Sequence, residues 1–285
     1  MSNISAMIQA VDFIESNLKE EIGVADVADA VSYSLYHFCR MFNQVIHHTP
    51  YDYLMRRRLS ESARELVETD KKIIDIAFDH RFNAPETYSR AFKRMFGLQP
   101  HRWRKRGMLD RRALMCRLAP EHIVHINKGD YLKPTLVEKG TFRLAGVMTL
   151  VTDDQAIIPR IWDTLPEELK RIRGADGTGR YYGIAWYPRD WQERGYLYMA
   201  AIETEPLDTA GSPLVAKTLR PSKWVRFVHK GPYRDLNLTQ DYIYQTWLPK
   251  SGEQLARSLE VEGHGPNPGG ASGEESETEI YVPIR

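Results

Sequence analysis

Apolar residues in the first part of the chain recur at steps of three and four, which is the spacing of a helix that buries one face. An N-terminal helix is predicted from an apolar stripe that includes Ile8 and Val11. A long helix is predicted over residues 51–67, and Pro50 suits its first turn because that turn leaves amide hydrogens unbonded in any case. A short helix is predicted over residues 101–106. This part of the chain is therefore predicted to be all-α.

Two segments within the helical part share the pattern of a helix-turn-helix motif. Each has a short helix, a tight turn and a second helix, and each carries a small residue, Ala28 or Ala77, where two helices would cross. The predicted helices cover residues 24–31 and 34–44 in the first motif and residues 73–78 and 83–96 in the second. Because such motifs place their second helix in the major groove, the pattern predicts binding to double-stranded DNA.

An exposed arginine is predicted on the second helix of each motif, Arg40 in the first and Arg90 in the second. Ser34 and Asn83 are expected to cap these helices, and Glu86 stands at the capping-box distance from Asn83. Arginine donates two hydrogen bonds to guanine, the commonest specific contact with a base. The alternative is that both are ordinary exposed helical arginines, but their equivalent positions favour a role in reading DNA.

The long helix over residues 51–67 also fits this interpretation by its length. About 17 residues of helix span roughly 25 Å. With its end connections such a helix would hold the two recognition helices about one DNA turn, ~34 Å, apart. We therefore expect one chain, acting as a monomer, to read two adjacent major grooves.

Beyond residue 107 the pattern changes to short β runs. Strands are predicted over residues 142–151, 180–186, 196–203, 215–219, 223–228 and 279–284. Helices over residues 157–171 and 236–248 interrupt them, so the order strand, helix, strand, strand occurs twice. This order predicts an α+β domain made of two related halves. Residues 263–277 are too rich in glycine and proline to be expected to order alone.

The change of pattern predicts a multidomain chain. Residues 1–107 form the DNA-binding domain, residues 108–133 a linker with one short strand at 114–118, and residues 134–285 the α+β domain. The length of 285 residues suffices for two separate cores.

Charge is distributed unevenly although the whole chain carries only +1. Residues 1–30 hold one basic residue and six acidic ones, whereas residues 81–107 hold eight basic residues against Glu86 alone. Such a run is expected of a surface that faces phosphates, the alternative being a solvated basic helix end. No apolar run approaches the ~20 residues that span a bilayer. The two cysteines, Cys39 and Cys116, give no disulfide pattern, so we expect a cytoplasmic protein without a membrane partner.

Motifs that carry catalysis are not found in the sequence. The histidine pairs at 47–48 and 122–125 have no cysteine or carboxylate cluster at metal-ligand spacing, apart from Glu121. Neither a glycine-rich phosphate loop nor a nucleophile motif is present. We therefore expect no enzyme activity, no catalytic residue, no metal and no cofactor.

Residues 4–106 resemble the DNA-binding domain of the AraC/XylS family, through the segments 32–42 and 75–100. The resemblance implies base contacts by Tyr36, Cys39, Arg40, Pro85, Glu86 and Arg90, with Thr87 nearby. The basic run adds Lys93, Arg94, Arg104 and Lys105 to the predicted DNA surface. The sequence departs from the family at Ser32 and Arg81, which replace its usual turn glycines, and at Pro85 and Glu86, where amides or other polar side chains are common.

The second domain resembles the GyrI-like effector-binding domain at residues 227–233, 247–252 and 279–284. The domain order resembles that of the Rob subgroup of AraC regulators. The resemblance implies a cleft between the two halves that binds small amphipathic, often cationic molecules beside a buried glutamate. An ungapped count from residues 251–252 places that glutamate at Glu262, with Val261 and His264 in place of the usual aromatics and Glu260 as the alternative. The aromatic residues expected at this cleft are Tyr182, Trp186, Tyr198, Trp224 and Tyr233.

Together these patterns predict a transcription regulator, an activator of the multidrug-response type, with DNA, a small-molecule effector and RNA polymerase as partners. Three alternatives remain open at this point. The second domain would bind a protein and make regulation constitutive, or it would hydrolyse a small electrophile or ester with tyrosine and glutamate in the same cleft. In the third, the chain would be an architectural protein that binds DNA without sequence preference.

Overall fold

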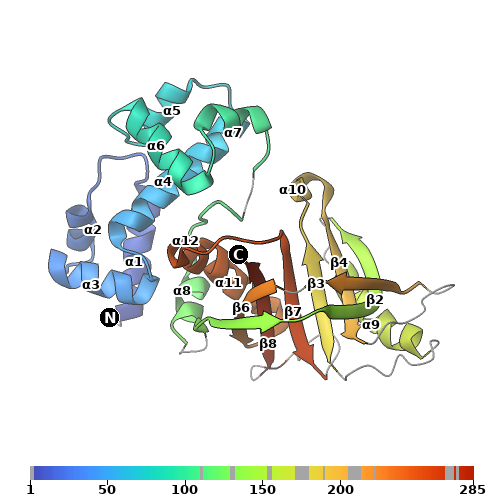
Figure 1. Cartoon of the computed structure of the whole chain (residues 1–285). Helices are drawn as coiled ribbons and strands as arrows, with labels where there is room; N and C mark the ends of the chain where they lie inside the picture. Colours follow the sequence, from blue (N-terminus) through green and yellow to red (C-terminus); the bar gives the residue numbers. More distant parts are fainter. Residues whose placement is uncertain are drawn as a thin grey trace. The chain divides into compact units, whose positions relative to one another are not determined.

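The computed structural model describes residues 3–109, 112–128, 132–152, 156–170, 180–188, 190–204, 213–220, 222–266, 273 and 276–285. The chain divides into two compact units (Figure 1). The helical unit comprises Met1–Lys128 together with Gln240–Lys250, and the sheet unit comprises Gly129–Thr239 together with Ser251–Arg285.

The helical unit contains the two predicted helix-turn-helix motifs. Its helices are α1 (Asn3–Ser16), α2 (Val24–Ala30), α3 (Leu35–Ile46), α4 (Pro50–Glu68), α5 (Ile73–Asp79), α6 (Pro85–Phe96), α7 (Pro100–Arg106) and α8 (Pro120–Ile126). The pairs α2–α3 and α5–α6 are the two motifs, and α4 connects them, so the all-α prediction for this part is confirmed.

Two separate apolar cores lie along α4. The core of the first motif takes Tyr53 and Leu54 from the first part of α4, beside Phe38 and Phe42 of α3. The core of the second motif takes Leu59, Ala63 and Leu66 from the last part of α4 and packs them with Tyr88, Phe92 and Trp103. Each motif is therefore stabilised by its own end of the same helix.

The predicted strand at residues 114–118 is wrong, because its apolar side chains anchor the chain to the helical cores. Met115 and Leu118 belong to the core of the first motif. Their backbone amides are bonded by side chains of α4: the Met115 amide donates to Ser60 Oγ at 2.9 Å, and the Leu118 amide donates to Tyr53 Oη at 3.3 Å. These side chains take the place of a partner strand, and helix α8 follows within the stretch that was predicted as a linker.

The sheet unit is built on eight antiparallel strands among the residues that the structure describes. They are β1 (Thr135–Lys139), β2 (Phe142–Val151), β3 (Tyr181–Trp186), β4 (Tyr196–Glu203), β5 (Val215–Leu219), β6 (Ser222–Lys230), β7 (Leu259–Gly265) and β8 (Glu277–Ile284). Their order is β1-β6-β8-β7-β3-β4-β2-β5. From either edge inward, the halves β1-β6-β8-β7 and β5-β2-β4-β3 match strand for strand and meet where β7 pairs with β3.

This arrangement confirms the prediction of an α+β domain with two related halves. All six strands predicted for this domain are present, but β1 and β7 were missed. Strand β7 extends to Gly265 and so enters the stretch 263–277 that was not expected to order alone. It is a central strand, bonded to β3 on one side and β8 on the other, and this pairing compensates for its glycine content. The remainder of that stretch lies mostly outside the described residues.

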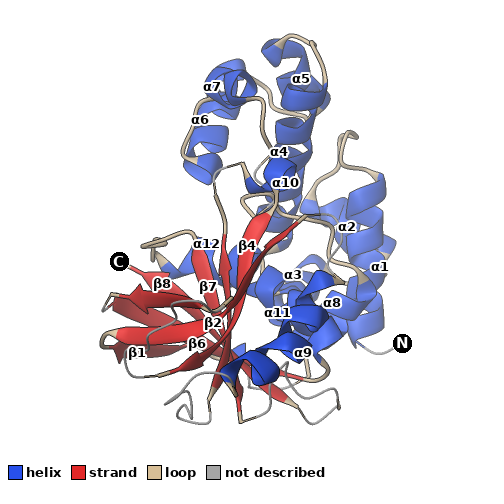
Figure 2. Ribbon diagram, turned by 90° about the vertical axis from the view of Figure 1, so that its right-hand side faces the viewer, coloured by secondary structure: helices blue, strands red, loops and turns tan. Residues whose placement is uncertain are grey.

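Helix α9 (Ile157–Leu169) lies against β2 and β4 on one face of the sheet (Figure 2). It packs Ile161, Trp162 and Leu165 against side chains of β4 that include Tyr198. The helix predicted over residues 236–248 comprises α11 (Leu236–Asp241), a π-helical turn over Tyr242–Trp247, and then α12 (Leu248–Ser251). The opposite face of the sheet carries a second apolar cluster.

Candidate functional site

The turns of the two helix-turn-helix motifs have matching backbone geometry. Ser32 and Arg81 occupy the positions where the family usually has glycine, and both adopt a left-handed conformation, with φ of 59° and 63°. The next residue in each turn donates its amide to the alanine of the crossing helix at 3.0 Å, Tyr33 to Ala28 and Phe82 to Ala77. The turns therefore keep their shape without glycine, at the steric cost that a Cβ atom imposes in this region.

Helix α3 presents the residues predicted to contact bases in the first groove. Ser34 is its N-cap by position, as predicted, but its side chain makes no capping hydrogen bond. Tyr36 is 80% exposed and Arg40 is also exposed. Cys39 is half-buried against the core of the first motif, so it offers less surface than its two neighbours.

Helix α6 presents the corresponding residues of the second motif. It begins at Pro85 and its N-cap is Ala84, which has no side-chain capping bond, so the predicted cap at Asn83 with its capping box is wrong. Proline at the first helical position fixes φ in advance and places the helix start after Asn83. Glu86, Thr87 and Arg90 are exposed, and Pro85 is half-buried.

The predicted phosphate contacts fall into two groups. Lys93 and Arg94 are exposed on the last turn of α6, and Lys105 is exposed on α7. Arg104 differs, because its guanidinium donates to the backbone carbonyls of Leu66 at 2.9 Å and Lys71 at 2.7 Å. Arg104 therefore ties α7 to the end of α4, and its contact with DNA phosphates stays a prediction.

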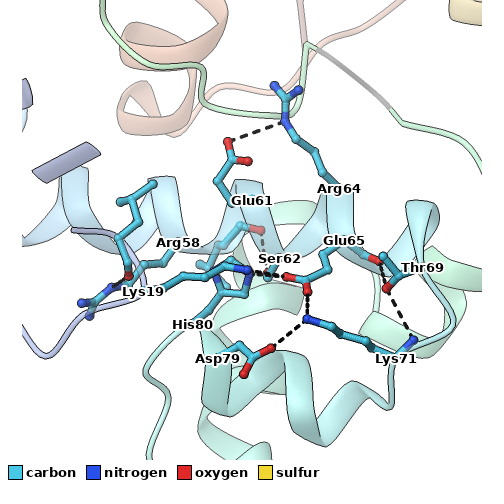
Figure 3. Close-up of polar contacts among 12 residues, drawn as sticks. Lys19, Arg58, Glu61, Ser62, Arg64, Glu65, Thr69, Lys71, Asp79 and His80 are labelled. Atoms are coloured by element: carbon cyan, nitrogen blue, oxygen red, sulfur yellow. Dashed lines mark hydrogen bonds and ion pairs between the residues drawn. The ribbon is translucent and has the colours of Figure 1, made fainter. Parts of the chain in front are cut away.

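A polar network around Glu65 of α4 fixes the second motif (Figure 3). The Glu65 carboxylate contacts Lys19 Nζ at 3.2 Å, Lys71 Nζ at 2.6 Å and His80 Nε2 at 3.0 Å. Burial raises the pKa of Glu65, but hydrogen bonds from Lys71, His80 and Lys19 outweigh it and lower the pKa to about 2. Because Lys19 follows α1 and His80 ends α5, one carboxylate joins three parts of the unit.

The segment that follows α1 is also bonded by two arginines. Arg58 of α4 donates to the carbonyls of Leu18 and Glu20, both at 2.8 Å. Arg81, in the turn of the second motif, donates to the carbonyl of Lys19 at 2.5 Å. The turn of the second motif is thereby attached to the helices of the first.

The sheet unit brings Glu262 to the line where its two halves meet. Glu262 lies on β7 opposite Gly183 of β3. Its Oε2 atom accepts hydrogen bonds from the hydroxyls of Tyr198 and Tyr233, each at 2.9 Å. A Cβ atom on Gly183 would lie 2.2 Å from the Tyr198 hydroxyl and 2.6 Å from Glu262 Oε2. Glycine is therefore required here for the three side chains to meet.

Two further side chains complete the Glu262 cluster, which comprises Trp162, Tyr198, Tyr233, Glu262 and His264. Trp162 of α9 donates from Nε1 to the Tyr198 hydroxyl at 3.3 Å, and His264 Nε2 lies 3.4 Å from Glu262 Oε2. Burial, together with the nearby Glu262 carboxylate, raises the pKa of Tyr198 and of Tyr233 well above the usual value. Both phenols therefore remain protonated and act as donors to the carboxylate.

A cavity of about 430 Å³ lies beside this cluster. It is lined by Ile158, Pro159, Trp162, Asp163, Pro166, Glu167 and Tyr233. Two of the cluster residues, Trp162 and Tyr233, thus also form the cavity wall. Aromatic faces and nearby carboxylates attract organic cations.

Only part of the predicted ligand set meets at this place. Tyr198, Tyr233 and Glu262 come together, whereas Tyr182, Trp186 and Trp224 belong to the apolar cluster on the opposite face of the sheet. Successive strand residues point to opposite faces, so Tyr182 and Trp186 lie on one face of β3 while Gly183 faces Glu262. Trp162 was missed as a site residue because it reads as part of an amphipathic helix. Glu260 is also fully buried.

Among the described residues, no group of three or more His, Cys, Asp or Glu side chains has an arrangement that would hold a metal ion. None of the helices in the described ranges is long and apolar enough to cross a membrane.

Known proteins resemble the two parts of the chain separately. Residues 27–106 match the model of a helix-turn-helix domain, and residues 132–285 match that of the GyrI-like small molecule binding domain. The HTH-type transcriptional regulator YbfP of Bacillus subtilis is 35% identical over 99 residues, which are 35% of this chain and 34% of that protein. The right origin-binding protein of Escherichia coli is 38% identical over 93 residues, covering 33% of this chain and 32% of its own. The multiple antibiotic resistance protein MarA of Escherichia coli is 32% identical over 98 residues, or 34% of this chain and 77% of MarA.

The fold and these matches define a chain with two helix-turn-helix motifs and a second domain of a small-molecule-binding type. The chain belongs to the GyrI-like family through its C-terminal half and is a Rob-like member of the AraC/XylS family. The matches span about a third of the length of the first two relatives.

Proposed function

We propose that the chain is a transcription activator that reads two adjacent major grooves as a monomer and is controlled by a small amphipathic cation. In this proposal α3 reads one groove with Tyr36, Cys39 and Arg40. Helix α6 reads the next with Pro85, Glu86, Thr87 and Arg90, while Lys93, Arg94 and Lys105 contact phosphates. The exposure of these side chains supports the assignment, with Cys39 and Pro85 contributing less surface.

The observation that carries the ligand proposal is the buried carboxylate of Glu262 at the meeting line of the two halves. Glu262 is only 4% exposed, and its carboxylate contacts two neutral phenols and one histidine. Phenols stabilise a buried charge through hydrogen bonds but do not neutralise it. A cation that enters the adjacent cavity would supply the missing positive charge.

Binding is favoured over hydrolysis by the state of the two tyrosines. A phenol must lose its proton to act as a nucleophile or as a base, and burial raises the pKa of both Tyr198 and Tyr233. A protonated phenol that donates to Glu262 is suited to holding that carboxylate in place. The cluster thus supports a binding site.

The proposal is tested by calorimetry on the full chain with tetraphenylphosphonium, a lipophilic aromatic cation, and with neutral triphenylphosphine oxide. Glu262→Gln keeps the shape of the side chain and removes its charge. It should lower affinity for the cation by about 1.5–3 kcal/mol, the range for hydrogen bonds to charged groups, and should leave the neutral compound unaffected.

Glu260→Gln is the matched control, because Glu260 is a buried carboxylate two residues earlier on β7. It should leave cation affinity close to that of the unaltered chain. A loss with Glu260→Gln but not with Glu262→Gln would move the charge-sensing role to Glu260. Equal losses for the cation and the neutral compound would remove Glu262 from that role.

The domain boundaries and the polymerase contact belong to the same proposal. We infer a DNA-binding domain over residues 1–107, a linker over 108–133 and an effector domain over 134–285, with RNA polymerase as the partner of the DNA-bound activator. Transcription from a bound promoter in a purified system should rise when tetraphenylphosphonium is added. An unchanged transcript level with unchanged DNA occupancy would favour constitutive regulation through a protein partner.

A further inference from the structure

The Glu262 cluster contains a histidine whose ring nitrogens make no hydrogen bond. His264 follows Glu262 by two residues on β7, so both side chains lie on the same face of the sheet. The His264 side chain is fully buried and that of Glu262 is 5% exposed. Neither Nδ1 nor Nε2 of His264 has a hydrogen-bond partner, which is unusual for buried polar atoms.

Another buried histidine of the same unit shows the contrast. His229 is also fully buried, but its Nδ1 lies 2.9 Å from Thr239 Oγ1 and its Nε2 lies 3.2 Å from the carbonyl of Pro232. Those bonds fix the ring of His229 and satisfy both nitrogens. His264 has no such partners, and its Nε2 atom lies 3.4 Å from the charged Glu262 Oε2.

His264 also touches the residues that form the cavity wall. Its ring packs edge-on against Trp162, with 4.9 Å between centroids, and lies 5.7 Å from the ring of Tyr233. Both of these residues line the cavity. The imidazole therefore lies behind the cavity wall, next to the carboxylate that an incoming cation would pair with.

Among the groups around His264, the Glu262 carboxylate is placed to pair with a protonated imidazole. Tyr198 of β4 and Tyr233 both donate to the same oxygen of Glu262, and Trp162 of α9 is uncharged. Other charged side chains toward this face are Asp163 and Glu167 of α9, which line the cavity, and the buried Glu168 of α9 and Glu260 of β7. A protonated imidazole would pair with Glu262 and neutralise the negative charge that a ligand cation needs.

We propose that His264 is a specificity-determining residue that makes cation binding at Glu262 depend on proton release. With His264 neutral, the Glu262 charge is available and the site binds amphipathic cations. With His264 protonated, the pair is internally neutral and the site prefers uncharged amphipathic molecules of the same size. The inference rests on the proposed ligand site and adds the rule by which that site selects among ligands.

The test measures the affinity of the full chain for tetraphenylphosphonium between about pH 5 and 8, the range in which histidines change charge. If one proton leaves for each cation bound, affinity should fall by up to about tenfold for each pH unit on the acid side. Calorimetry in two buffers of different ionisation enthalpy should show release of up to about one proton. Triphenylphosphine oxide, the neutral control, should bind with little pH dependence.

His264→Phe replaces the imidazole with an aromatic ring of similar size that holds no proton. It should abolish the pH dependence and give cation affinity at pH 5 close to that at pH 8. His264→Gln, a second uncharged replacement, should do the same, and thermal melting checks that both variants fold. NMR of the His264 ring in the unaltered chain gives a readout independent of substitution, because its titration should shift to lower pH when the cation is bound.

The outcomes separate the two proposals. Cation binding that is lost in Glu262→Gln yet independent of pH in the unaltered chain would overturn the role of His264 and keep the ligand site. The same pH slope in His264→Phe would assign the proton to another group and overturn the inference. Failure of the unaltered chain to bind tetraphenylphosphonium at any pH would overturn both.

Discussion

The two helix-turn-helix motifs share one backbone but differ in what they expose. Helix α3 starts with Leu35 and Tyr36, which are 50% and 80% exposed, and has no basic residue in its last turn. Helix α6 starts with Pro85 and Glu86 and ends with Lys93 and Arg94. Apolar side chains at a helix start suit contacts with thymine methyl groups, whereas basic ends suit phosphates.

Under the proposed function, this difference means that the two motifs contribute unequally to DNA binding. Both motifs would contact bases, and the second would add more of the positive charge that faces phosphates. Each motif has its own buried core, with Phe42 in the first and Phe92 in the second, and the partly buried Met95 packs against both.

The largest effect is expected from Phe92→Ala. Phe92 is fully buried, and its ring packs against the rings of Tyr88, Phe96 and Trp103. Its truncation should cost about 3–5 kcal/mol of folding free energy. Hydrogen exchange should accelerate in α5, α6 and α7 and stay slow in α2 and α3. Equal acceleration in both motifs would show that they unfold as one core.

DNA affinity should distinguish base contacts from phosphate contacts. Arg40→Ala should cost about 1–3 kcal/mol on a specific site and relax base preference locally. Lys105→Ala should weaken binding to all sequences alike and reduce the salt slope by about one unit. Both are measured by titration at several salt concentrations. An Arg40→Ala loss that is the same on random DNA would make Arg40 a phosphate contact.

Low pH should destabilise the fold of the second motif through Glu65 and His80. Burial lowers the pKa of His80, so the stability that its neutral form provides is lost as pH falls below the ordinary histidine value of 6.5. The pKa of Glu65 is depressed from 4.5 to about 2, so its contribution is lost as pH falls from about 4.5 toward 2. Glu65→Gln should remove this second loss of folding free energy, of about 1 kcal/mol. The measurement is denaturation at a series of pH values. An unaltered acid profile would mean that the Glu65 contacts do not contribute to stability.

The first motif offers a parallel control for the acid effect. His48 Nδ1 lies 2.7 Å from a carboxylate oxygen of Asp52, near the start of α4. Asp52 has its pKa lowered to about 2 because hydrogen bonds and charges from His48 and Arg56 outweigh its burial. Asp52→Asn should therefore change acid sensitivity around the first motif, as read from hydrogen exchange, and leave the second unaffected.

The smallest effect is expected at the two turns. Ser32→Gly should stabilise the chain by about 0.5–1 kcal/mol, because glycine relieves the positive φ and this outweighs its greater freedom when unfolded. Arg81→Gly gives the same relief but loses the bond to the Lys19 carbonyl and the ion pair with Glu20 at 3.6 Å. Its net effect should be close to zero in thermal melting. Equal stabilisation by both changes would show that the Arg81 contacts contribute nothing.

The sequence was sufficient for the elements with a strong repeat. The helical period located the two motifs and the long α4, and short runs of β-forming residues located β2, β4 and β5 with their observed bounds. Strand β7 was missed for a physical reason. Its segment Leu259–Gly265 alternates apolar and polar residues only briefly before the glycine- and proline-rich stretch from residue 263, which was interpreted as unable to order alone. Pairing with β3 and β8, which lie elsewhere in the chain, makes it a central strand.

The candidate site was only partly predictable for a related reason. Glu262 came from a resemblance, because composition does not single out one carboxylate. Tyr182, Trp186 and Trp224 were assigned to the ligand from their aromatic character, but strand register places them on the other face. Arg104 was assigned to DNA from its place in a basic run, and its bonds to the end of α4 were not predicted. Register and distant partners are not visible in local sequence.

The central claim is that two unlike motifs read two adjacent grooves, and selection of bound sites from random duplexes tests it most directly. The unaltered chain should enrich a consensus with two blocks of conserved bases about 10 base pairs apart centre to centre. Arg40→Ala should erase conserved positions in one block only, and Arg90→Ala in the other only. A single block, or loss of the same block in both variants, would contradict the claim.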